Sequence, residues 1–430
     1  MVKIAEDLID SIKQAVPLER VMKEMYGKEV KDNKTICDFH QDSSPSLHIF
    51  PDGGYKCFVC GAGKRGEELT LPTGERIIDG GNSVFGYVMN KERVPFPEAV
   101  RIVGRFGGFN MPEFRPDPEA EEKKRTVTEA NRKMRLNLLN DEDALRYLAE
   151  RGIDRTDIDK WRLGMVPWDW APRNYAGRIV FGLVEAGYGE QNPTIGMAYR
   201  VREYEDYLKH GWLRDDFERY LHAKYTEDGK IKSINPKYYN DPKSSIYDKS
   251  SFLYGLNYAD AALREMPYDK RYMVVMEGYT DVILAHKAGL ETSVAVCSAS
   301  LTDQQADEIV RRVKRVYLWL DGDAAGQNGM ARALPKLLKR GCEVLIVNSE
   351  GRDPADIVLG GESIQNYIAK NARNAVQLVI QQQAEEYDRV STQLRTKALG
   401  ELLPLLESVS DEAAQIAYRT MVAKRFDVIL

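Results

Sequence analysis

Residues 272–281 read YMVVMEGYTD, residues 315–326 read RVYLWLDGDAAG, and residues 343–347 read EVLIV. Each stretch begins with a short apolar run, and SVAV at residues 293–296 adds another. Helical patterns lie between these runs, one ending at His286, one starting at Thr302 and one at Ala324. Strands that alternate with helices predict parallel strands joined by crossover helices. We therefore expect an α/β sheet between Pro267 and Gly360.

Acidic residues follow three of these predicted strands. Glu277 follows the first, Asp321 and Asp323 follow the second, and Asp353 comes after the third. Ligand sites in open α/β sheets form beyond the carboxyl ends of the strands, so these carboxylates should lie together. Carboxylates at such closeness repel one another unless cations neutralise them. Mg²⁺ and Mn²⁺ prefer oxygen ligands and also bind phosphates, which predicts metal-assisted phosphoryl transfer. Each piece alone is weak, because an isolated DGD is more often a turn.

Two ligand pairs near the N-terminus predict a zinc site. They are Cys37-x2-His40 and Cys57-x2-Cys60, with strand-like residues between them. Two-residue spacers let tight turns aim two ligands each at one tetrahedral ion, and four protein ligands make the site structural. The alternative is an accidental cluster of core thiols beside an unrelated histidine. The other cysteines, Cys297 and Cys342, lie in apolar runs and are expected to be small buried hydrophobes.

Length and composition bound the organisation of the chain. Its 430 residues predict two or three domains. It has no apolar run long enough to span a membrane and no signal peptide, so we expect a cytoplasmic protein. The net charge of −5 argues weakly against nucleic acid, although charge acts locally. The expected segments are a zinc-ribbon domain at 1–110, a proline-rich and charged linker at 111–130, globular segments at 131–266 and 267–360, and helices at 361–430.

The motifs EGYTD, DGDAAG and DPAD resemble the three signatures of a TOPRIM domain. Following a Cys-His-Cys-Cys ribbon, they make the chain similar to the DnaG-type primases of bacteria and phages. Further segments resemble stretches of the family's polymerase core and occur in the same order along the chain. They are YLAERGID, GRIVF, GMAYR, PKYYNDP and DKSSFLYGL. The resemblance implies a multi-domain α+β and α/β fold. Its parts would be an N-terminal zinc ribbon, a mixed α+β basic subdomain, a TOPRIM parallel-sheet subdomain and a C-terminal helical bundle.

The resemblance also implies the function. It would be DNA-directed synthesis of short RNA primers on single-stranded DNA by nucleotidyl transfer, with structural Zn²⁺ and catalytic Mg²⁺ or Mn²⁺. The partners would be template, ribonucleoside triphosphates and RNA product, in the bacterial cytoplasm or, for a phage enzyme, that of the host. A replicative helicase is a further candidate, although we expect this chain to lack the C-terminal domain that docks on the helicase in the family. The alternatives are a TOPRIM nuclease, a topoisomerase-related enzyme, or a zinc-dependent DNA-binding module without turnover.

The resemblance assigns roles to individual residues. Catalysis would rest on Glu277, Asp321 and Asp323. The Mg²⁺ or Mn²⁺ ligands would be Glu277, Asp281, Asp321, Asp323, Asp353 and Asp356. Template and nucleotides would meet Arg178, Arg200, Lys237, Asn240 and Lys249. From composition alone, each of these polar residues would usually be a solvated surface group, although neighbouring tyrosines favour a groove that holds phosphates and stacked bases.

The chain departs from the family in three places. Insertions are expected at about Lys64–Gly81 and Val201–Asn235, and their roles are open. The motif Asp353-Pro354-Ala355-Asp356 has one residue more than the family's Asp-Pro-Asp, which puts the equivalence of Asp356 in doubt. The chain also lacks a GxxxxGK[ST] phosphate loop, which argues against a fused helicase.

Overall fold

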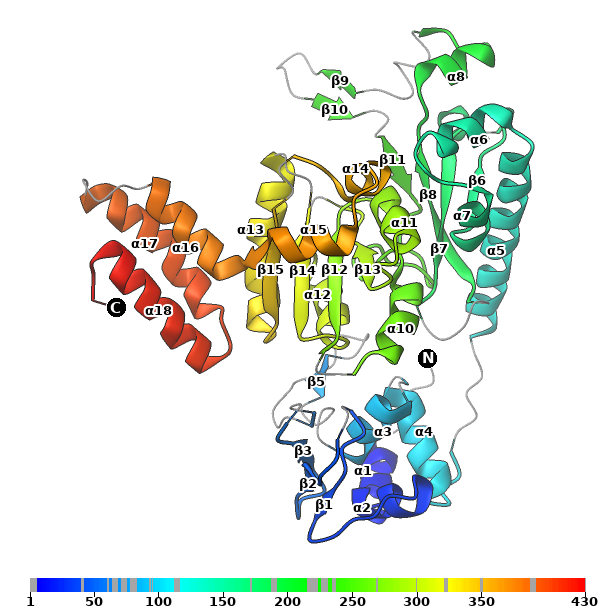
Figure 1. The fold of residues 1–430 in the computed structure, drawn as a ribbon. Helices are drawn as coiled ribbons and strands as arrows, with labels where there is room; N and C mark the ends of the chain where they lie inside the picture. The colour runs from blue at the N-terminus through cyan, green and yellow to red at the C-terminus, as the bar shows by residue number, and fades with distance from the viewer. Residues whose placement is uncertain are drawn as a thin grey trace. The chain divides into compact units, whose positions relative to one another are not determined.

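The computed structural model describes residues 6–429 except 40–41, 60–61, 64–68, 71–75, 78–82, 93, 95, 112–116, 171, 187–191, 215–222, 226–230, 234–236, 268–269, 299, 321–323, 349–350 and 387–391. The chain forms two compact units (Figure 1). Unit 1 contains Met1–Pro118 with Met266–Lys270, and unit 2 contains Glu119–Glu265 with Arg271–Leu430. Among the described residues, no helix has the length and apolar character needed to cross a lipid bilayer.

Unit 1 combines small sheets with helices. Its helices are α1 (Glu6–Ala15), α2 (Leu18–Arg20), the π-helical η1 (Val21–Met25), α3 (Val84–Glu92) and α4 (Phe96–Phe106). Its strands are β1 (Lys34–Thr35), β2 (Leu47–Ile49) and β3 (Tyr55–Cys57), which form one antiparallel sheet, and the pair β4 (Leu69–Thr70) and β5 (Arg76–Ile77). Apolar residues of the helices, such as Ile12, Tyr87 and Val100, form one core with Leu47 and Tyr55 of the sheet. The expected zinc-ribbon domain is therefore a ribbon supported by helices.

Unit 2 begins with a long helix, so the expected linker is too long. Helix α5 runs from Pro118 to Leu139, and residues 118–130 are helical rather than extended. The stretch carries few large apolar residues because only one side of this helix packs: Asn131, Met134 and Leu138 are its buried residues. Helices α6 (Glu142–Ala149) and α7 (Arg155–Lys160) follow. Composition misled the expectation, because a solvated helix and a linker share charged residues.

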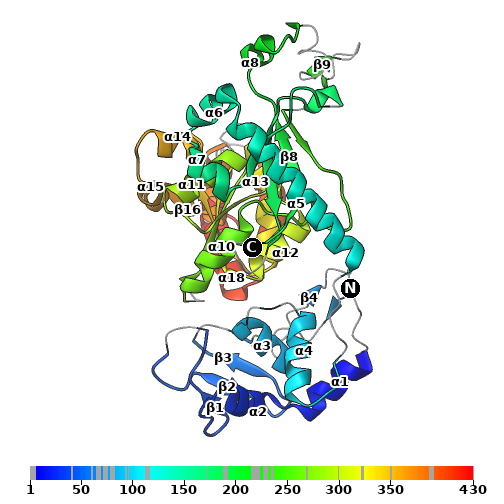
Figure 2. The same ribbon diagram turned by 90° about the vertical axis from the view of Figure 1, so that its right-hand side faces the viewer.

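Helix α5 packs on a four-stranded antiparallel sheet with the order β11-β8-β7-β6 (Figure 2). The Asn131 side chain donates to the Arg162 carbonyl, and the Asn137 side chain donates to the Met165 carbonyl. The strands are β6 (Leu163–Met165), β7 (Ile179–Val184), β8 (Thr194–Arg200) and β11 (Tyr238–Asn240). Short elements between them are η2 (Arg173–Tyr175), α8 (Tyr204–Lys209) and the hairpin of β9 (Ala223–Tyr225) and β10 (Ile231–Ser233).

The second sheet of unit 2 confirms the expected α/β arrangement. Strands β12 (Tyr272–Met276), β13 (Ser293–Ala295), β14 (Arg315–Trp319) and β15 (Glu343–Val347) are parallel, in the order β13-β12-β14-β15. All of Met273–Met276 is buried, and successive residues of a strand point to opposite faces, so both faces of the sheet are covered. The helices are α10 (Leu256–Glu265), α11 (Tyr279–Lys287), α12 (Asp303–Val310), α13 (Ala324–Lys339), α14 (Pro354–Leu359) and α15 (Ile364–Asn371).

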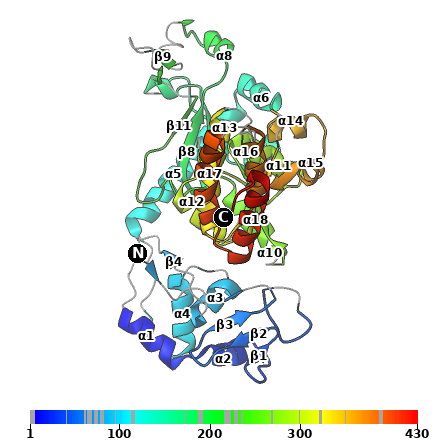
Figure 3. The ribbon, with the colours of Figure 1, turned by 90° about the vertical axis from the view of Figure 1, so that its left-hand side faces the viewer.

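The C-terminal segment is helical, as expected, but it begins with a strand. Strand β16 (Ala372–Asn374) pairs antiparallel with β15 and closes that edge of the sheet. Helices α16 (Ala375–Glu386), α17 (Thr392–Glu407) and α18 (Glu412–Phe426) then pack together (Figure 3). A shared core joins the two sheets of unit 2, since Phe181 of β7, Val274 of β12 and Trp319 of β14 belong to one buried cluster. The two expected segments 131–266 and 267–360 therefore form one compact body.

Candidate active site and zinc centre

The carboxyl edge of the parallel sheet carries Glu277. This residue directly follows β12, and its carbonyl accepts a hydrogen bond at 3.1 Å from the Cys297 amide, just beyond β13. Helix α11 starts two residues later, and the Gly278 amide donates to Asp281 at 3.1 Å. A Cβ at Gly278 would lie 2.5 Å from that carboxylate, so a side chain here would displace Asp281. Asp281 is itself buried and closes the turn that presents Glu277.

Asp353 and Asp356 lie at the first turn of α14. The Asp353 side chain accepts from the Asp356 amide, and the Asp356 side chain accepts from the Asp353 amide. Asp353 is half-buried and Asp356 is exposed. Burial raises the pKa of Asp353, the charge of Asp356 raises it further, and the charge of Lys237 lowers it. The charge of Lys237, the residue immediately before β11 of the other sheet, thus acts on this carboxylate.

A divalent cation fits the chemistry of these donors. Glu277 and Asp353 would contribute hard oxygen ligands, and burial of Asp353 would favour neutralisation by a cation. The predicted ligands Asp321 and Asp323 lie outside the described residues; they follow β14, which is the strand between β12 and β15. Two of the three acidic turns are therefore described, and the parallel sheet sets the carboxyl ends of their strands at one edge.

Three predicted nucleotide-binding residues lie on β8, on β11 or immediately before β11. Lys237 is exposed, immediately before β11. The Arg200 guanidinium donates to the hydroxyls of Tyr147 and Tyr238 and lies over the Tyr238 ring. Burial raises the pKa of Tyr238 to about 12, and the charge of Asp281 adds to the rise while Arg200 opposes it. Asn240, the last residue of β11, accepts a hydrogen bond from the Tyr279 hydroxyl at 2.7 Å. These contacts bring the end of β11 to the edge that carries Glu277.

Lys249 and Arg178 differ in their surroundings. Lys249 is partly buried and lies close enough to Cys297 for its charge to act on that thiol. Arg178 is fully buried, with Nε donating to the Asn174 carbonyl at 2.8 Å and the guanidinium over the Tyr239 ring. Burial lowers the pKa of Arg178. In the described conformation Arg178 is therefore buried inside the protein rather than exposed in a groove. Its expected contact with nucleic acid stays a prediction.

The start of the insertion at Val201–Asn235 is anchored by a buried arginine. Arg202 donates to the Gly177 carbonyl at 3.1 Å and lies 3.6 Å from Asp141 and 3.7 Å from Asp206. Its guanidinium lies over Trp168, whose indole also stacks on His210 with ring centroids 3.8 Å apart. These contacts fix α8 to the four-stranded antiparallel sheet. Much of the remainder of this insertion, and most of the one at Lys64–Gly81, lies outside the described residues.

Two of the four predicted zinc ligands are described, and their surroundings suit a metal thiolate. Cys37 and Cys57 are both buried. The Phe39 amide donates to Cys37 Sγ and the Val59 amide to Cys57 Sγ, each at 3.4 Å, as expected for knuckles that stabilise negative sulfur. His40 and Cys60 lie outside the described residues. Gly63 adopts φ +79°, and a Cβ there would lie 2.3 Å from the Tyr55 carbonyl, so the second knuckle needs a glycine.

Charged groups hold the first knuckle in place. Asp38, one residue after Cys37, is paired with Lys28 at 2.8 Å and Lys91 at 2.7 Å, and it accepts a hydrogen bond from the Tyr87 hydroxyl. Asp42 accepts from the Cys37 amide at 2.8 Å and from Ser46, whose hydroxyl is 3.3 Å from Cys57 Sγ. The residues therefore fit a structural zinc ion, with partners around the ligands that set their orientation.

The sequence analysis missed Tyr279 and Cys297. Tyr279 lies inside the EGYTD motif, and Cys297 follows β13 at the same edge as Glu277. The rule that placed Glu277, a residue just beyond the carboxyl end of a strand, would have found Cys297. Its backbone is left-handed (φ 54°), which is unusual for cysteine and marks a constrained turn rather than a filler position. Cys342, in contrast, is buried as expected.

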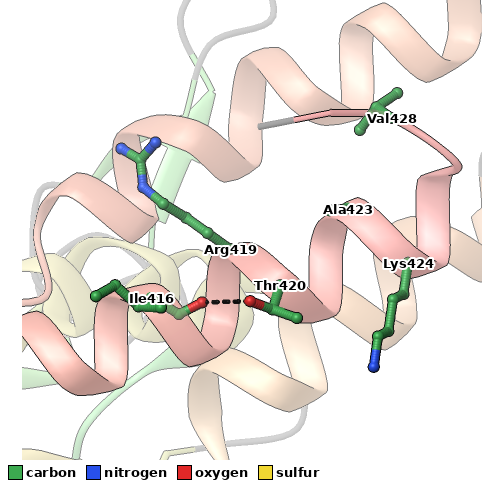
Figure 4. Close-up of a pocket in the computed structure, with 6 residues that line it drawn as sticks. All are labelled: Ile416, Arg419, Thr420, Ala423, Lys424 and Val428. Atoms are coloured by element: carbon green, nitrogen blue, oxygen red, sulfur yellow. Dashed lines mark hydrogen bonds between the residues drawn. The ribbon is translucent and has the colours of Figure 1, made fainter.

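A shallow pocket lies on the C-terminal helix α18 (Figure 4). Its lining residues are Ile416, Arg419, Thr420, Ala423, Lys424 and Val428. The Thr420 hydroxyl donates to the Ile416 carbonyl of its own helix at 2.9 Å. The pocket contains none of the predicted site residues, so it is separate from the carboxylate edge.

Two family models match the chain. The CHC2 zinc finger matches residues 4–71, and a Toprim-like domain matches residues 274–358. The first implies zinc and the second a divalent metal. The chain is 27% identical over 460 residues to a DNA primase of Halalkalibacterium halodurans, which covers 100% of this chain and 70% of that protein. It is 29% identical over 371 residues to a DNA primase of Campylobacter jejuni, covering 84% and 56%. The chain spans between 56% and 71% of the length of five such relatives.

Solved structures agree with the fold. The zinc-binding and RNA polymerase domains of the Aquifex aeolicus primase superpose with a TM-score of 0.54 at 21% identity, covering 98% of this chain and 97% of that one. A DNA primase domain from Pseudomonas aeruginosa gives 0.58 at 20% identity, covering 71% and 97%. A DnaG primase catalytic domain bound to single-stranded DNA gives 0.54 at 20% identity, covering 73% and 99%. With a CHC2 zinc finger and a Toprim-like domain in this order and on this fold, the chain is similar to the DnaG-type primases.

Proposed function

We propose that this protein is a DNA-templated primase that makes short RNA primers on single-stranded DNA by nucleotidyl transfer. One observation carries the proposal. The acidic edge of the parallel sheet is joined to the end of the antiparallel sheet that follows the cationic residue Lys237, because the Tyr279 hydroxyl, two residues after Glu277, donates to Asn240 of β11 at 2.7 Å within one compact unit. Carboxylates that hold cations, next to a lysine that meets phosphates, are the parts that nucleotidyl transfer requires.

The roles follow from the positions of the residues. A bound Mg²⁺ or Mn²⁺ would lower the pKa of an attacking hydroxyl and neutralise the developing phosphate charge. Glu277 and Asp353 would hold it, together with Asp321 and Asp323 as the resemblance implies. Lys237 and Lys249 would attract triphosphate oxygens. Arg200, fixed by Tyr147 and Tyr238, would present its guanidinium at a set orientation, which suits bidentate contact with phosphate.

The partners follow from the activity. Unit 1 would be folded by Zn²⁺ and would bind the single-stranded template, as in the primases it resembles. Ribonucleoside triphosphates would be the substrates and short RNA the product, in the cytoplasm where replicating DNA lies. A replicative helicase would be an additional partner that delivers the template.

RNA synthesis on unprimed single-stranded DNA tests the proposal. Labelled ribonucleotides are supplied with Mg²⁺ or Mn²⁺, and wild type is compared with Glu277→Gln. We expect short RNA from wild type and none from the variant, with DNA binding nearly unchanged because only one carboxylate charge is removed. The matched control is Glu291→Gln, which removes the same charge at an exposed residue. Glu291 lies just before β13, at the edge of the parallel sheet opposite to the one that carries Glu277.

The outcomes separate the alternatives. RNA from wild type and Glu291→Gln alone supports a primase with its site at Glu277. Degradation of the template without RNA would support a nuclease instead. RNA from Glu277→Gln would reject the assigned active site.

A further inference from the structure

One hydrogen bond connects the turn after Glu277 to the antiparallel sheet. Tyr279 is the first residue of α11 and lies two residues after Glu277; its hydroxyl donates to Asn240 Oδ1 at 2.7 Å. Asn240 ends β11, the strand that follows Lys237. The Tyr279 side chain is almost completely buried, so water does not compete for the bond. The bond therefore links the acidic edge directly to the strand beside the cationic residues.

Aromatic packing fixes the Tyr279 ring independently of its hydroxyl. The ring stacks on Phe181, with centroids 4.9 Å apart and planes inclined by 29°. Tyr254 meets it edge-on at 4.9 Å, and Tyr238, the partner of Arg200, lies at 5.3 Å. Removal of the hydroxyl alone should leave this packing intact, because a phenylalanine ring has the same shape. The contribution of the hydrogen bond can therefore be separated from that of the ring.

The backbone of Glu277 is held from the other side by Cys297. The amide of Cys297 donates to the Glu277 carbonyl at 3.1 Å, and its left-handed backbone is constrained by that turn. Burial raises the pKa of the Cys297 thiol to about 12, and the neighbouring Tyr279 hydroxyl lowers it slightly. Tyr279 thus lies between Asn240 on one sheet and the turn beyond β13 on the other.

We infer that Tyr279 is a positioning residue for the proposed nucleotidyl transfer, and that its bond to Asn240 keeps Glu277 in register with Lys237 on the neighbouring sheet. The inference rests on the proposed function and deepens it. It also gives Asn240 a role inside the protein, because its carbonyl oxygen is engaged by Tyr279. Loss of the bond lets the two sheets shift at the site, and small displacements of a metal-holding carboxylate reduce the rate of reaction.

The test compares Tyr279→Phe with Tyr254→Phe. Both remove one buried phenol hydroxyl from the same aromatic cluster, but the Tyr254 hydroxyl has no hydrogen-bond partner within the described part of the chain. We expect Tyr279→Phe to lower kcat about three- to tenfold, the range for one net hydrogen bond. The KM for ribonucleotides should stay within about twofold, and the Mg²⁺ concentration for half-maximal rate should rise. Tyr254→Phe should match wild type in all three.

A double-mutant cycle with Asn240→Ala identifies the partner. If the bond acts as inferred, the double variant Tyr279→Phe/Asn240→Ala is no slower than the slower single variant, because both changes remove the same interaction. Three results would each overturn the inference. The first is a kcat of the double variant that is lowered by the product of the two single losses. The others are a kcat of Tyr279→Phe equal to that of wild type, and a kcat of Tyr254→Phe lowered as much as that of Tyr279→Phe. A wild-type protein that makes no RNA would reject the proposed function and this inference with it, whereas an active wild type with an unchanged Tyr279→Phe rejects the inference alone.

Discussion

Asp353 and Asp356 cap the same helix turn reciprocally. The Asp356 amide donates to Asp353 Oδ1 at 2.7 Å, and the Asp353 amide donates to Asp356 Oδ2 at 3.3 Å. The additional residue in this motif therefore has a structural meaning, because it sets the second aspartate at the third helical position, where a capping box requires it. Asp356 therefore orients Asp353. This relationship predicts different roles for the two carboxylates, with Asp353 holding the metal and Asp356 setting the orientation of Asp353.

Asp353→Asn and Asp356→Ala should differ in their effects on protein stability and on Mg²⁺-dependent RNA synthesis. Asparagine caps a helix as well as aspartate does, so Asp353→Asn should keep its stability but lose RNA synthesis, because a ligand charge is gone. Asp356→Ala should lose about 1 kcal/mol of stability and roughly ten- to hundredfold in metal affinity, as for partners that orient a ligand. Activity as a function of Mg²⁺ concentration and thermal unfolding measure both. Equal loss of metal affinity in the two variants would make Asp356 a ligand in its own right.

Zinc removal should unfold unit 1 and leave unit 2 folded. Metal binding contributes roughly 10–16 kcal/mol of apparent free energy to comparable small zinc modules. Unit 2 has its own core, which includes Phe181 and Trp319. Calorimetry with and without a strong zinc chelator should therefore show loss of one unfolding transition and retention of the other. Cys57→Ser should reproduce the chelated profile in the presence of zinc. A single transition that disappears completely would contradict the independence of the two units.

Asp38→Ala should destabilise unit 1 because Asp38 is one partner of a buried ion pair. The Asp38 side chain is only 13% exposed and pairs with Lys28, which is 11% exposed. Removal of one partner from a buried ion pair costs about 3–5 kcal/mol, because the other charge is left in a poorly hydrated place. The same substitution at the exposed Asp10 of α1 is the control, with an expected change within about 0.5 kcal/mol. Thermal unfolding of the zinc-loaded protein measures both; similar midpoints would show that the pairs contribute little.

Unit 2 should lose stability as the pH falls from about 6.5 to about 4 because of His286. Burial lowers the pKa of His286 to about 4, while the hydrogen bond to the Ser293 carbonyl opposes the shift. The unfolded histidine keeps its ordinary pKa of about 6.5 and therefore binds a proton first, so the unfolded state gains as the pH falls. Above pH 6.5 the neutral His286 contributes about 3 kcal/mol to the free energy of unfolding of unit 2, and this contribution is lost by pH 4. His286→Gln, which does not titrate, should flatten this part of the pH profile of unfolding; an unchanged slope would assign it to other groups.

The sequence predicted the acidic edge better than it predicted the groove. Apolar runs and helix periods determine a parallel sheet, and the geometry of such sheets then locates Glu277 and Asp353 without further information. The contacts of Arg178 and Asn240 depend on which side of a strand they face and on what packs there. Arg178 is buried against Tyr239, and Asn240 bonds Tyr279, a residue of the other sheet. Neither contact has a local signal in the sequence, because each forms only when distant segments meet.

Two elements show where local patterns mislead. Residues 118–130 have a linker composition, yet they are helical because α5 needs few apolar residues on its packed side. Strand β16, of three residues, has no strand pattern of its own and exists because the edge of β15 is available for pairing. Both outcomes depend on tertiary context, which outweighs propensity for short or solvated elements.

The direct pairing of β8 with β11 makes the sequence that follows α8 exchangeable. Tyr238 lies opposite Arg200 in this pair, so the register is set by the strands themselves rather than by the residues that connect them. A lineage can lengthen, shorten or replace the connection while the sheet on which Arg200 and Asn240 lie keeps its form. Evolution can therefore vary an appendage next to the proposed site without rebuilding the site, and protein engineers can use the same position to insert a foreign domain.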